Sequence, residues 1–187
     1  GWAAGLRALA CARDGCPIMR TNTAGLALGR APVTESSEED EDAVFNANDA
    51  GLVRITPRCP PHVRDGGHIV NMGSVAGRQA YENGATYVTS KFAVRGFTYA
   101  LREDLLGRPI RITTVDAGLV ETEFSIVRFK GATEQADAVY KGVDPLTAAD
   151  IADCVMWALT PPGHGNIRET GVQERHQASV ARVVRHE

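Results

Sequence analysis

Short runs of β-branched and apolar residues alternate along this chain with longer stretches that have helical spacing. The clearest run, HIVNM at His68–Met72, follows the turn residues Asp65–Gly67, and a second run, RITTVDA, covers Arg111–Ala117. Short strands that alternate with longer helices indicate βα units built around a parallel sheet. The alternation therefore predicts an α/β fold.

Two weaker runs and two strong helical stretches continue this pattern. PIMRTN at 17–22 and NIRETGV at 166–172 are further strand candidates. Apolar residues recur at helical spacing over 85–106, before the helix-ending GRP. A last helix is expected to begin after Thr147 as its N-cap and to run to Thr160, where two prolines stop it.

The acidic run ESSEEDED at 35–42 has two interpretations. It could be a disordered tract, or it could begin a helix that continues into AVFNANDAGLVRI. We favour the helix, because Ser36 or Ser37 can cap it and the carboxylates interact favourably with its dipole. Pro57 would remove an amide donor from that helix, so we expect the helix to end or kink near Thr56.

The bulk composition limits the partners of the chain. A formal net charge of −3 and a pI near 6.0 give no electrostatic basis for binding nucleic acid or an anionic membrane. No apolar run approaches the ~20 residues that span a bilayer, and Arg7 and Arg13 interrupt the N-terminal stretch too early for a signal peptide. We therefore expect a single cytoplasmic domain over 1–187 with a small-molecule or protein partner.

Cysteine and histidine spacing gives no sign of a metal site. The four cysteines have neither C-x-x-C spacing nor a nearby pair of histidines, and the five histidines never form H-x-x-x-H. We therefore expect no metal ligands and four free thiols, which are Cys11, Cys16, Cys59 and Cys154.

The stretch YVTSK places Tyr87 and Lys91 four residues apart on the helix expected over 85–106, so the two side chains share one face. A tyrosine that exchanges protons near neutral pH needs its pKa lowered by roughly 3 units, or about 4 kcal/mol. One ammonium about 4 Å away at an effective dielectric near 20 supplies about that much. The pair can therefore be an acid/base unit, or simply a packed tyrosine and a solvated lysine.

Ser74 lies in NMGSVAG, just after the strand expected at His68–Met72. Ligands of open parallel sheets bind outside the carboxyl ends of the strands, where this hydroxyl would lie. The helix that carries Tyr87 follows by a loop and would bring its first turn over the same crevice. Ser74 could therefore hold a substrate oxygen while Tyr87 exchanges a proton with it, or it could be an ordinary turn serine.

Five motifs together resemble the short-chain dehydrogenase/reductase family. They match in order and spacing over residues 18 to about 167, and they are NTAG (22–25), NANDAG (46–51), GHIVNMGSVAG (67–77), YVTSK (87–91) and DAGLVETEF (116–124). The segment from Pro145 to Ile167 further resembles the branch that oxidises 3-hydroxy acids with NADP. The resemblance implies a Rossmann-like, doubly wound parallel sheet and an oxidoreductase that transfers a hydride.

The resemblance also implies roles for particular residues. Tyr87 would be the acid or base, Lys91 would lower its pKa and bind the nicotinamide ribose, and Ser74 would hold the substrate oxygen. Asn48 would bend its helix and keep a water molecule in a proton relay to the lysine, whereas Asn46 would be a surface amide. The expected cofactor is NADP or NAD, bound by Asn22, Ala24, Gly25, Tyr87, Lys91, Ala117, Gly118, Val120 and Thr122.

One part of the family's pattern is not found in this sequence. The phosphate-binding glycine-rich loop should lie well before NTAG, and GWAAGLRALACARDG has glycines without the strand, turn and helix that frame such a loop. We therefore expect the fold to be N-terminally truncated, with its first strands and the segment that selects NADP or NAD absent. The strand that ends at NTAG would become an exposed edge. In the family, the helix that we expect to end or kink near Thr56 forms much of the dimer contact, so the oligomer would be weakened.

Three functional hypotheses follow. The leading one is an oxidoreductase acting on a small hydroxy acid, alcohol or carbonyl compound; the second is an inactive homologue that binds a partner through its sheet edge; the third is another nucleotide-binding α/β protein with a chance Tyr-x-x-x-Lys. Four residues lie where the family binds substrate, namely Arg78, Gln79, Tyr81 and Arg128. Either arginine could pair with a substrate carboxylate or be an exposed, solvated charge.

Overall fold

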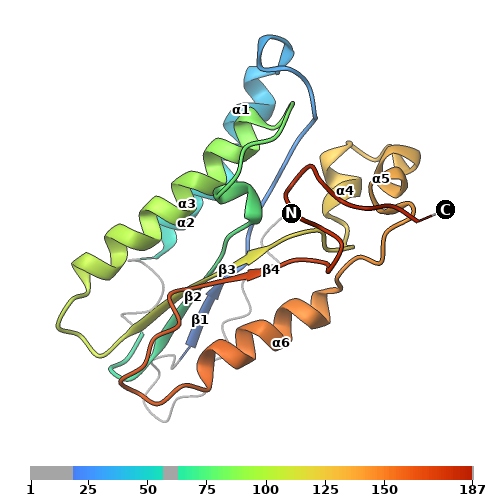
Figure 1. The fold of residues 1–187 in the computed structure, drawn as a ribbon. Helices are drawn as coiled ribbons and strands as arrows, with labels where there is room; N and C mark the ends of the chain where they lie inside the picture. The colour runs from blue at the N-terminus through green and yellow to red at the C-terminus, as the bar shows by residue number, and fades with distance from the viewer. Residues whose placement is uncertain (1–18, 57–62, 187) are drawn as a thin grey trace.

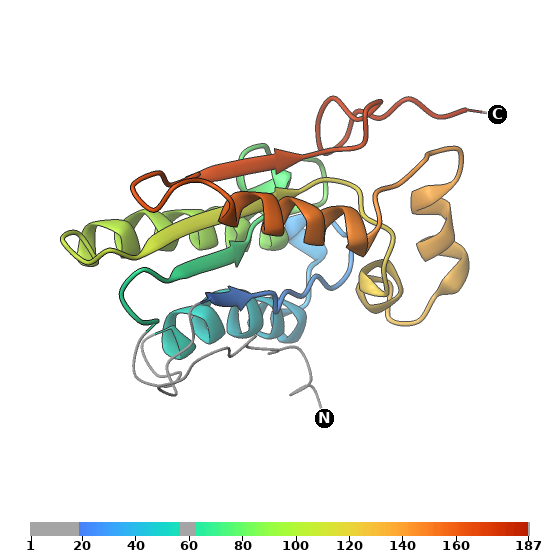
Figure 2. The same cartoon turned by 90° about the horizontal axis from the view of Figure 1, so that it is seen from below.

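The computed structural model describes residues 19–56 and 63–186, which form a parallel sheet between helices (Figure 1). The sheet has the strand order β1-β2-β3-β4, which Figure 2 shows from a second side. The strands are β1 (Met19–Asn22), β2 (His68–Met72), β3 (Arg111–Ala117) and β4 (Glu169–Val172). The predicted α/β fold with a parallel sheet is confirmed, although β4 starts later than the predicted segment 166–172.

Helices cover both faces of this sheet. In Figure 1, α1, α2 and α3 lie on one face and α6 on the other, while α4 and α5 lie beyond the carboxyl end of β3. The helices are α1 (Glu38–Phe45), α2 (Gly51–Ile55), α3 (Ala85–Asp104), α4 (Phe124–Arg128), α5 (Thr133–Tyr140) and α6 (Ala148–Leu159). Three short turns are η1 (Val33–Glu35), the π-helical η2 (Asn46–Ala50) and η3 (Val75–Gly77).

The acidic run begins a helix, as predicted, but not through the predicted cap. Ser37 occupies the N-cap position of α1, and within the described residues its side chain makes no capping hydrogen bond. The Ser36 hydroxyl instead donates to the Val33 carbonyl oxygen at 3.0 Å and contacts the Glu41 carboxylate. The capping role predicted for these serines is therefore wrong, because Ser36 closes the turn that precedes the helix.

The other helix boundaries agree with the sequence. The α6 helix has a capping box, in which the Thr147 hydroxyl accepts from the Asp150 amide and the Asp150 carboxylate accepts from the Thr147 amide at 2.7 Å. The α3 helix ends two positions before the predicted Leu106. The helix that follows the acidic run ends at Ile55, next to the predicted Thr56.

The core has two halves, one on each face of the sheet. On the α6 face, Val70 and Val115 pack with the α6 residues Ile151 and Val155. On the α3 face, Ile69 and Ile112 pack against side chains of α3 and of the segments beside it. Successive strand residues point to opposite faces, so β2 and β3 contribute to both halves. Because each buried aliphatic side chain contributes roughly 1.5–3 kcal/mol, this packing fixes the strand register and aligns the strand ends.

Some predictions concern residues outside the described part of the chain. The predictions made for residues 1–17, for the prolines of 57–62 and for Cys11, Cys16 and Cys59 fall there, while Cys154 is a free thiol. Within the sheet that the described residues form, β1 is an edge strand. Among the described helices, none is both long enough and apolar enough to cross a membrane. The single domain over 1–187 stays a prediction.

Candidate active site

Ser74 joins the carboxyl ends of two neighbouring strands. It follows β2 and starts the turn η3, where its Oγ accepts a hydrogen bond from the Ala76 amide at 3.1 Å. The same Oγ donates to the carbonyl oxygen of Ala117, at the end of β3, at 3.3 Å. Ser74 also lies beside Tyr87 and lowers the pKa of that phenol. The serine and the tyrosine therefore come together at the edge of the sheet where parallel folds bind ligands.

Tyr87 lies between aromatic and cationic neighbours. Its ring contacts the Phe124 ring at a centroid distance of 5.6 Å, and the Lys91 ammonium and the Arg128 guanidinium each lie 5.7 Å from its centroid. Burial raises the pKa of Tyr87, while the nearby Ser74 hydroxyl and the charge of Arg128 lower it. Burial dominates, so the phenol is protonated at neutral pH in this structure.

Lys91 is a buried ammonium between two carboxylates. Its Nζ donates to the Met72 carbonyl oxygen at 3.2 Å. Burial lowers the pKa of Lys91 to about 8, against the attraction of Asp49 and Asp116. Burial also raises the pKa of Asp49 to about 6, against the attraction of Lys91. The lysine therefore loses its charge at a lower pH than an exposed lysine does.

Asn48 fixes the loop after β1 against α3. It lies in the π-helical turn η2, is 2% exposed, and exchanges two hydrogen bonds with the backbone of Leu26 at 2.7 and 2.8 Å. Its Nδ2 also donates to the Ser90 hydroxyl at 2.9 Å. A Cβ on Gly25 would lie 3.4 Å from the Lys91 ammonium, so this glycine lets the loop approach the lysine. The local departure from α-helical geometry agrees with the helix bend expected at Asn48, and Asn46 is exposed.

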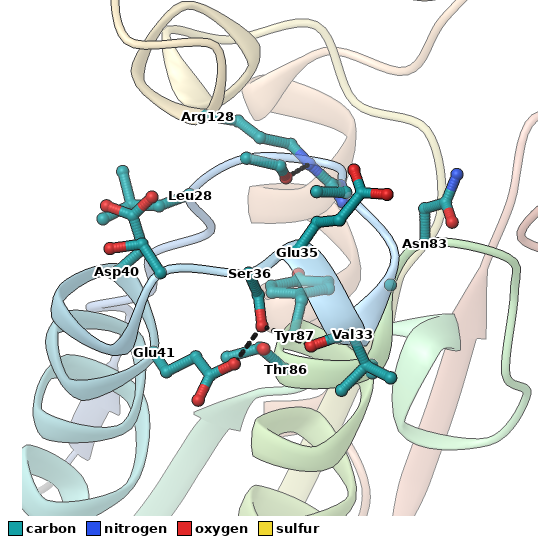
Figure 3. Close-up of a pocket in the computed structure, with 15 residues that line it drawn as sticks. Leu28, Val33, Glu35, Ser36, Asp40, Glu41, Asn83, Thr86, Tyr87 and Arg128 are labelled. Atoms are coloured by element: carbon teal, nitrogen blue, oxygen red, sulfur yellow. Dashed lines mark hydrogen bonds between the residues drawn. The ribbon is translucent and has the colours of Figure 1, made fainter.

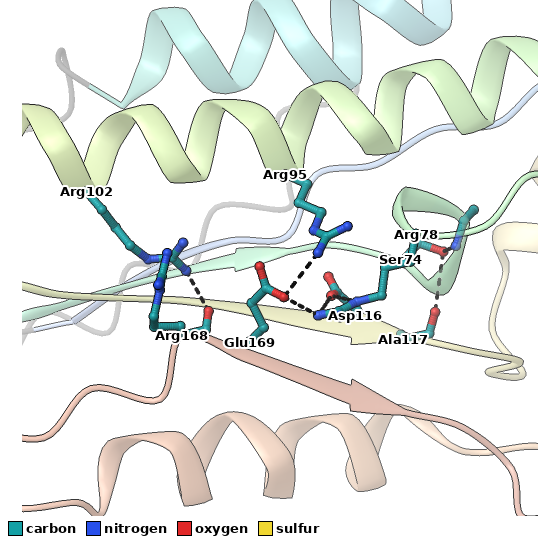
Figure 4. Close-up of polar contacts among 9 residues, drawn as sticks. Ser74, Arg78, Arg95, Arg102, Asp116, Ala117, Arg168 and Glu169 are labelled. Carbon is teal, nitrogen blue, oxygen red and sulfur yellow. Dashed lines mark hydrogen bonds and ion pairs between the residues drawn. The ribbon is translucent and has the colours of Figure 1, made fainter.

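Arg78 is part of an ion network rather than a free cation. Its guanidinium donates to Asp116 at 2.6 Å and to Glu169 at 2.7 Å, and Glu169 also contacts Arg95 at 3.5 Å (Figure 4). Asp116 is buried, and burial raises its pKa while Arg78 lowers it. Arg78 is exposed, as one of its two hypotheses states, but its charge is paired with protein carboxylates and anchors the loop that starts at Ser74. The pairing of Arg78 with a substrate carboxylate stays a prediction.

Arg128 reaches into the site from α4. Its Nε donates to the Gly29 carbonyl oxygen at 3.1 Å and its Nη2 donates to the Tyr81 hydroxyl at 2.8 Å. The guanidinium also lies 5.7 Å from the centroid of the Tyr81 ring. Arg128 is half-buried, so the hypothesis of an exposed, solvated charge is wrong for Arg128.

Two hollows meet at Ser74 and Tyr87. A groove of about 540 Å³ runs between the ends of β1 to β3 and α6, and a smaller cavity of about 140 Å³ lies beside α4 and α5 and contains Arg30 and Arg128. Both are lined by Ser74, Tyr87, Gly118, Val120 and Phe124. The hydroxyl pair thus stands between a larger and a smaller binding space.

The predicted cofactor residues divide into two groups around the large groove. Five of them line it, and they are Tyr87, Ala117, Gly118, Val120 and Thr122. The other four, Asn22, Ala24, Gly25 and Lys91, lie next to this lining without forming part of it. The Asn22 amide donates to Asn71 at 2.7 Å and accepts from Arg20 at 2.9 Å, so the sheet already occupies it. Thr21 and Thr23 line the groove there instead.

Two carboxylates that act on Lys91, those of Asp49 and Asp116, are not among the residues predicted from the sequence. Asp116 is a charged residue within an otherwise uncharged stretch of a buried strand. Because a buried charge needs a partner, this position could have been identified from the sequence as a paired carboxylate. Asp49 follows Asn48 in NDAG, and its sequence gives no comparable signal. Among the described residues, no group of three or more histidine, cysteine or acidic side chains is placed to hold a metal ion.

Comparisons with known proteins agree with this geometry. A family profile described as short chain dehydrogenase matches residues 18–132. An NADP-dependent 3-hydroxy acid dehydrogenase from Schizosaccharomyces pombe is 42% identical over 88% of this chain, and a serine 3-dehydrogenase from Agrobacterium fabrum is 39% identical over 84%. The chain spans 64% of the length of each of these two relatives.

The fold of a solved relative is also similar. The closed form of a serine dehydrogenase complexed with NADP+ superimposes with a TM-score of 0.84 and 36% identity, over 96% of this chain and 74% of that one. The profile, the relatives and the solved structure agree with one another and with the five motifs. This chain therefore belongs to the short-chain dehydrogenase family.

Proposed function

We propose that this chain carries the catalytic half of an oxidoreductase that transfers a hydride between NADP, or NAD, and a small hydroxy acid. The observation that carries the proposal is that Ser74 and Tyr87 lie together where the large groove meets the smaller cavity. The names of the relatives support the substrate class and the preference for NADP.

The large groove fits an extended cofactor. It lies outside the carboxyl ends of the strands, and Gly118 and the end of β2 are part of its lining. Thr122, Val120 and the Gly118 backbone would hold the nicotinamide, and Lys91 would hold its ribose because one described acceptor uses only one of its three ammonium protons. Asn22, Ala24 and Gly25 would lie towards the adenosine. A bound nicotinamide nucleotide supplies the hydride donor or acceptor.

In this proposal, side chains of the protein transfer the proton and stabilise the charge on the substrate oxygen. Ser74 Oγ would donate a hydrogen bond to the substrate oxygen and stabilise the negative charge that develops on it. Tyr87 Oη would give its proton to that oxygen when a carbonyl is reduced, and the phenolate would take the proton back when an alcohol is oxidised. Asn48 holds the loop that brings Gly25 to Lys91, which keeps the lysine close to the tyrosine.

The smaller cavity favours an acidic substrate. Arg128 lines it together with Ser74 and Tyr87, so a carboxylate on the guanidinium would place a nearby hydroxyl at the Ser74–Tyr87 pair. A volume of about 140 Å³ suits a small molecule. The substrate class can be tested with a panel of 3-hydroxy acids and matched uncharged alcohols. A strict preference for the uncharged alcohols would contradict the role of Arg128.

A second candidate function is an inactive homologue that binds a protein partner. The observation that favours it is β1, which has an unpaired side in the sheet of the described residues and could add a strand from another chain. A weakened homo-oligomer and a cytoplasmic location stay predictions under both functions.

Cofactor binding separates the two functions. Titrating the chain with NADPH and, separately, NADH should quench its tryptophan fluorescence to saturation, with tighter binding of NADPH. Replacing Thr122 by valine keeps the size of the side chain and should weaken binding, while Thr133→Val, on the distant α5 helix, is a matched control that should not. If neither nucleotide saturates the protein at millimolar concentration, the oxidoreductase proposal fails for this chain.

A further inference from the structure

Two cations flank the ring of Tyr87, and they respond differently to pH. The Lys91 ammonium and the Arg128 guanidinium lie at the same distance, 5.7 Å, from the ring centroid. The lysine is one turn along α3 from the tyrosine, whereas the arginine comes from α4. The tyrosine therefore has one cation that belongs to the recognised motif and one that does not.

Arg128 is held in place by the protein alone. Its side chain donates to the Gly29 carbonyl oxygen, and its own backbone carbonyl accepts from the Gly29 amide at 2.9 Å. The Tyr81 hydroxyl accepts from Nη2, and the Tyr81 ring lies under the guanidinium. Because these contacts fix the guanidinium without a substrate, its position at Tyr87 is a built feature of the site.

The charge of Lys91 is less available to Tyr87 than its distance suggests. The ammonium donates to the Met72 carbonyl oxygen, and it interacts with the carboxylates of Asp49 and Asp116. Burial also makes this lysine lose its proton near pH 8 in the protein without cofactor, because it lowers the pKa to about 8. An arginine side chain stays charged over the whole range in which proteins are studied.

We propose that Arg128 is a positioning residue that stabilises the phenolate form of Tyr87, in addition to its role toward a substrate carboxylate. A fixed positive charge beside a ring favours the negative form of that ring. The charge of Arg128 acts on Tyr87 in this direction. The importance of this effect for catalysis rests on the proposed function, but the effect itself needs neither cofactor nor substrate.

Of the other groups that face Tyr87, some favour its phenolate form and others favour its neutral phenol. Ser74 lowers the pKa of Tyr87, and Lys91 adds a positive charge beside the ring. On the α1 side, a cavity of about 120 Å³ contains Tyr87, Arg128 and the acidic residues Glu35, Asp40 and Glu41 (Figure 3). Asp40 is paired with Lys130 at 2.7 Å, and Glu41 contacts Ser36. The remaining acidic charge opposes that of Arg128, so only a direct titration gives the net effect.

The test is the ionisation of Tyr87 in the chain without ligands. The four tyrosines are replaced by 3-fluorotyrosine, which lowers the pKa of the phenol into a range where the protein stays folded, and ¹⁹F NMR follows each ring. Tyr87→Phe assigns the Tyr87 signal by removing it. The titration midpoint of this signal is then measured for the wild type and for variants of the two arginines and of Tyr81.

Arg128→Gln should raise the midpoint by about 1 to 2 pH units, as expected for a charge about 6 Å away at an effective dielectric near 20. Arg128→Lys should keep most of the wild-type midpoint, and Tyr81→Phe should raise it slightly by releasing one anchor of the guanidinium. Arg30→Gln removes the same charge from the same cavity without contacting Tyr87, so it should leave the midpoint unchanged.

Two results would overturn the proposal. One is a midpoint in folded Arg128→Gln equal to that of the wild type. The other is an equal shift in Arg30→Gln, which would indicate a general charge effect. If circular dichroism shows that Arg128→Gln does not fold, Arg128→Met replaces it, because methionine keeps the aliphatic part of the side chain. A higher Tyr87 midpoint in Arg128→Met than in Arg128→Lys would support the effect of a fixed charge. A midpoint equal to that of the wild type would overturn the proposal. These titration midpoints are measured without cofactor or substrate, so they do not depend on whether the protein has dehydrogenase activity.

Discussion

Replacing Arg78 by glutamine should destabilise the protein by removing the cation that hydrogen-bonds to the buried Asp116 carboxylate. Asp116 is 2% exposed, and Arg78 contacts it at 2.6 Å. Removing one partner of a buried ion pair costs about 3–5 kcal/mol. The Arg78 side chain is 32% exposed, so solvent screens the pair and we expect a loss of roughly 2–3 kcal/mol.

The assay is urea unfolding at neutral pH for Arg78→Gln, Asp116→Asn and the double variant. The cycle should give a coupling energy of about 2 kcal/mol between the two side chains, because the neutral amide introduced by Asp116→Asn no longer needs a cation. Arg95→Gln is the matched control, since the ion pair of Arg95 in this network is with the outer carboxylate of Glu169, at 3.5 Å, and its loss should cost less than about 0.5 kcal/mol.

The effect of Arg78→Gln also has a defined pH dependence. Burial raises the pKa of Asp116 above its ordinary value, and loss of Arg78 would raise it further. The penalty should therefore be largest at neutral pH and shrink as the pH falls through the raised pKa of Asp116, where the carboxyl takes up a proton. A loss no larger than that of Arg95→Gln, or one that grows in acid, would refute this account of the network.

Three further predictions concern stability. Gly77→Ala should separate η3 from α3, because the new Cβ would lie 2.7 Å from the Lys91 carbonyl oxygen; thermal unfolding should show a loss of about 1–3 kcal/mol, and an unchanged Tm would be a contradiction. Thr147→Ala should cost about 1 kcal/mol in urea unfolding by removing the α6 cap, and Thr147→Ser should restore it. Burial lowers the pKa of His68 to about 4. The free energy of unfolding of the wild type should therefore fall by about 3 kcal/mol relative to that of His68→Gln as the pH drops from 6.5 to 4. Equal pH dependence of the two free energies would contradict this.

Much of the fold could be predicted because local patterns and packing agree. HIVNM and RITTVDA are strands by their local sequence pattern and by their packing in the core. Thr147 and Asp150 form a capping box that sequence spacing alone indicates. The serines before α1 show where this reasoning stops. Both have cap chemistry, but Ser36 finds partners in its own turn, and only the three-dimensional path of 33–37 decides between these uses.

The site was predictable where the chemistry is local and unpredictable where it depends on distant partners. Tyr87 and Lys91 share a helix face by spacing, and Ser74 meets Tyr87 because strand ends and the following helix converge. The fate of Arg78 depends on Asp116 and Glu169, which are 38 and 91 residues away in sequence. No local pattern identifies such partners, so the ion network is visible only in the folded chain.

The measurement that tests the central claim most directly compares wild type with Tyr87→Phe in two assays. NADPH affinity is measured by fluorescence, and oxidation of a small 3-hydroxy acid with NADP+ is followed by the absorbance of the reduced nicotinamide. If Tyr87 transfers the proton, the variant should bind NADPH with nearly the wild-type affinity and lose at least about 10²-fold in turnover. Turnover that survives in Tyr87→Phe, or that falls only in proportion to NADPH affinity, would contradict the account.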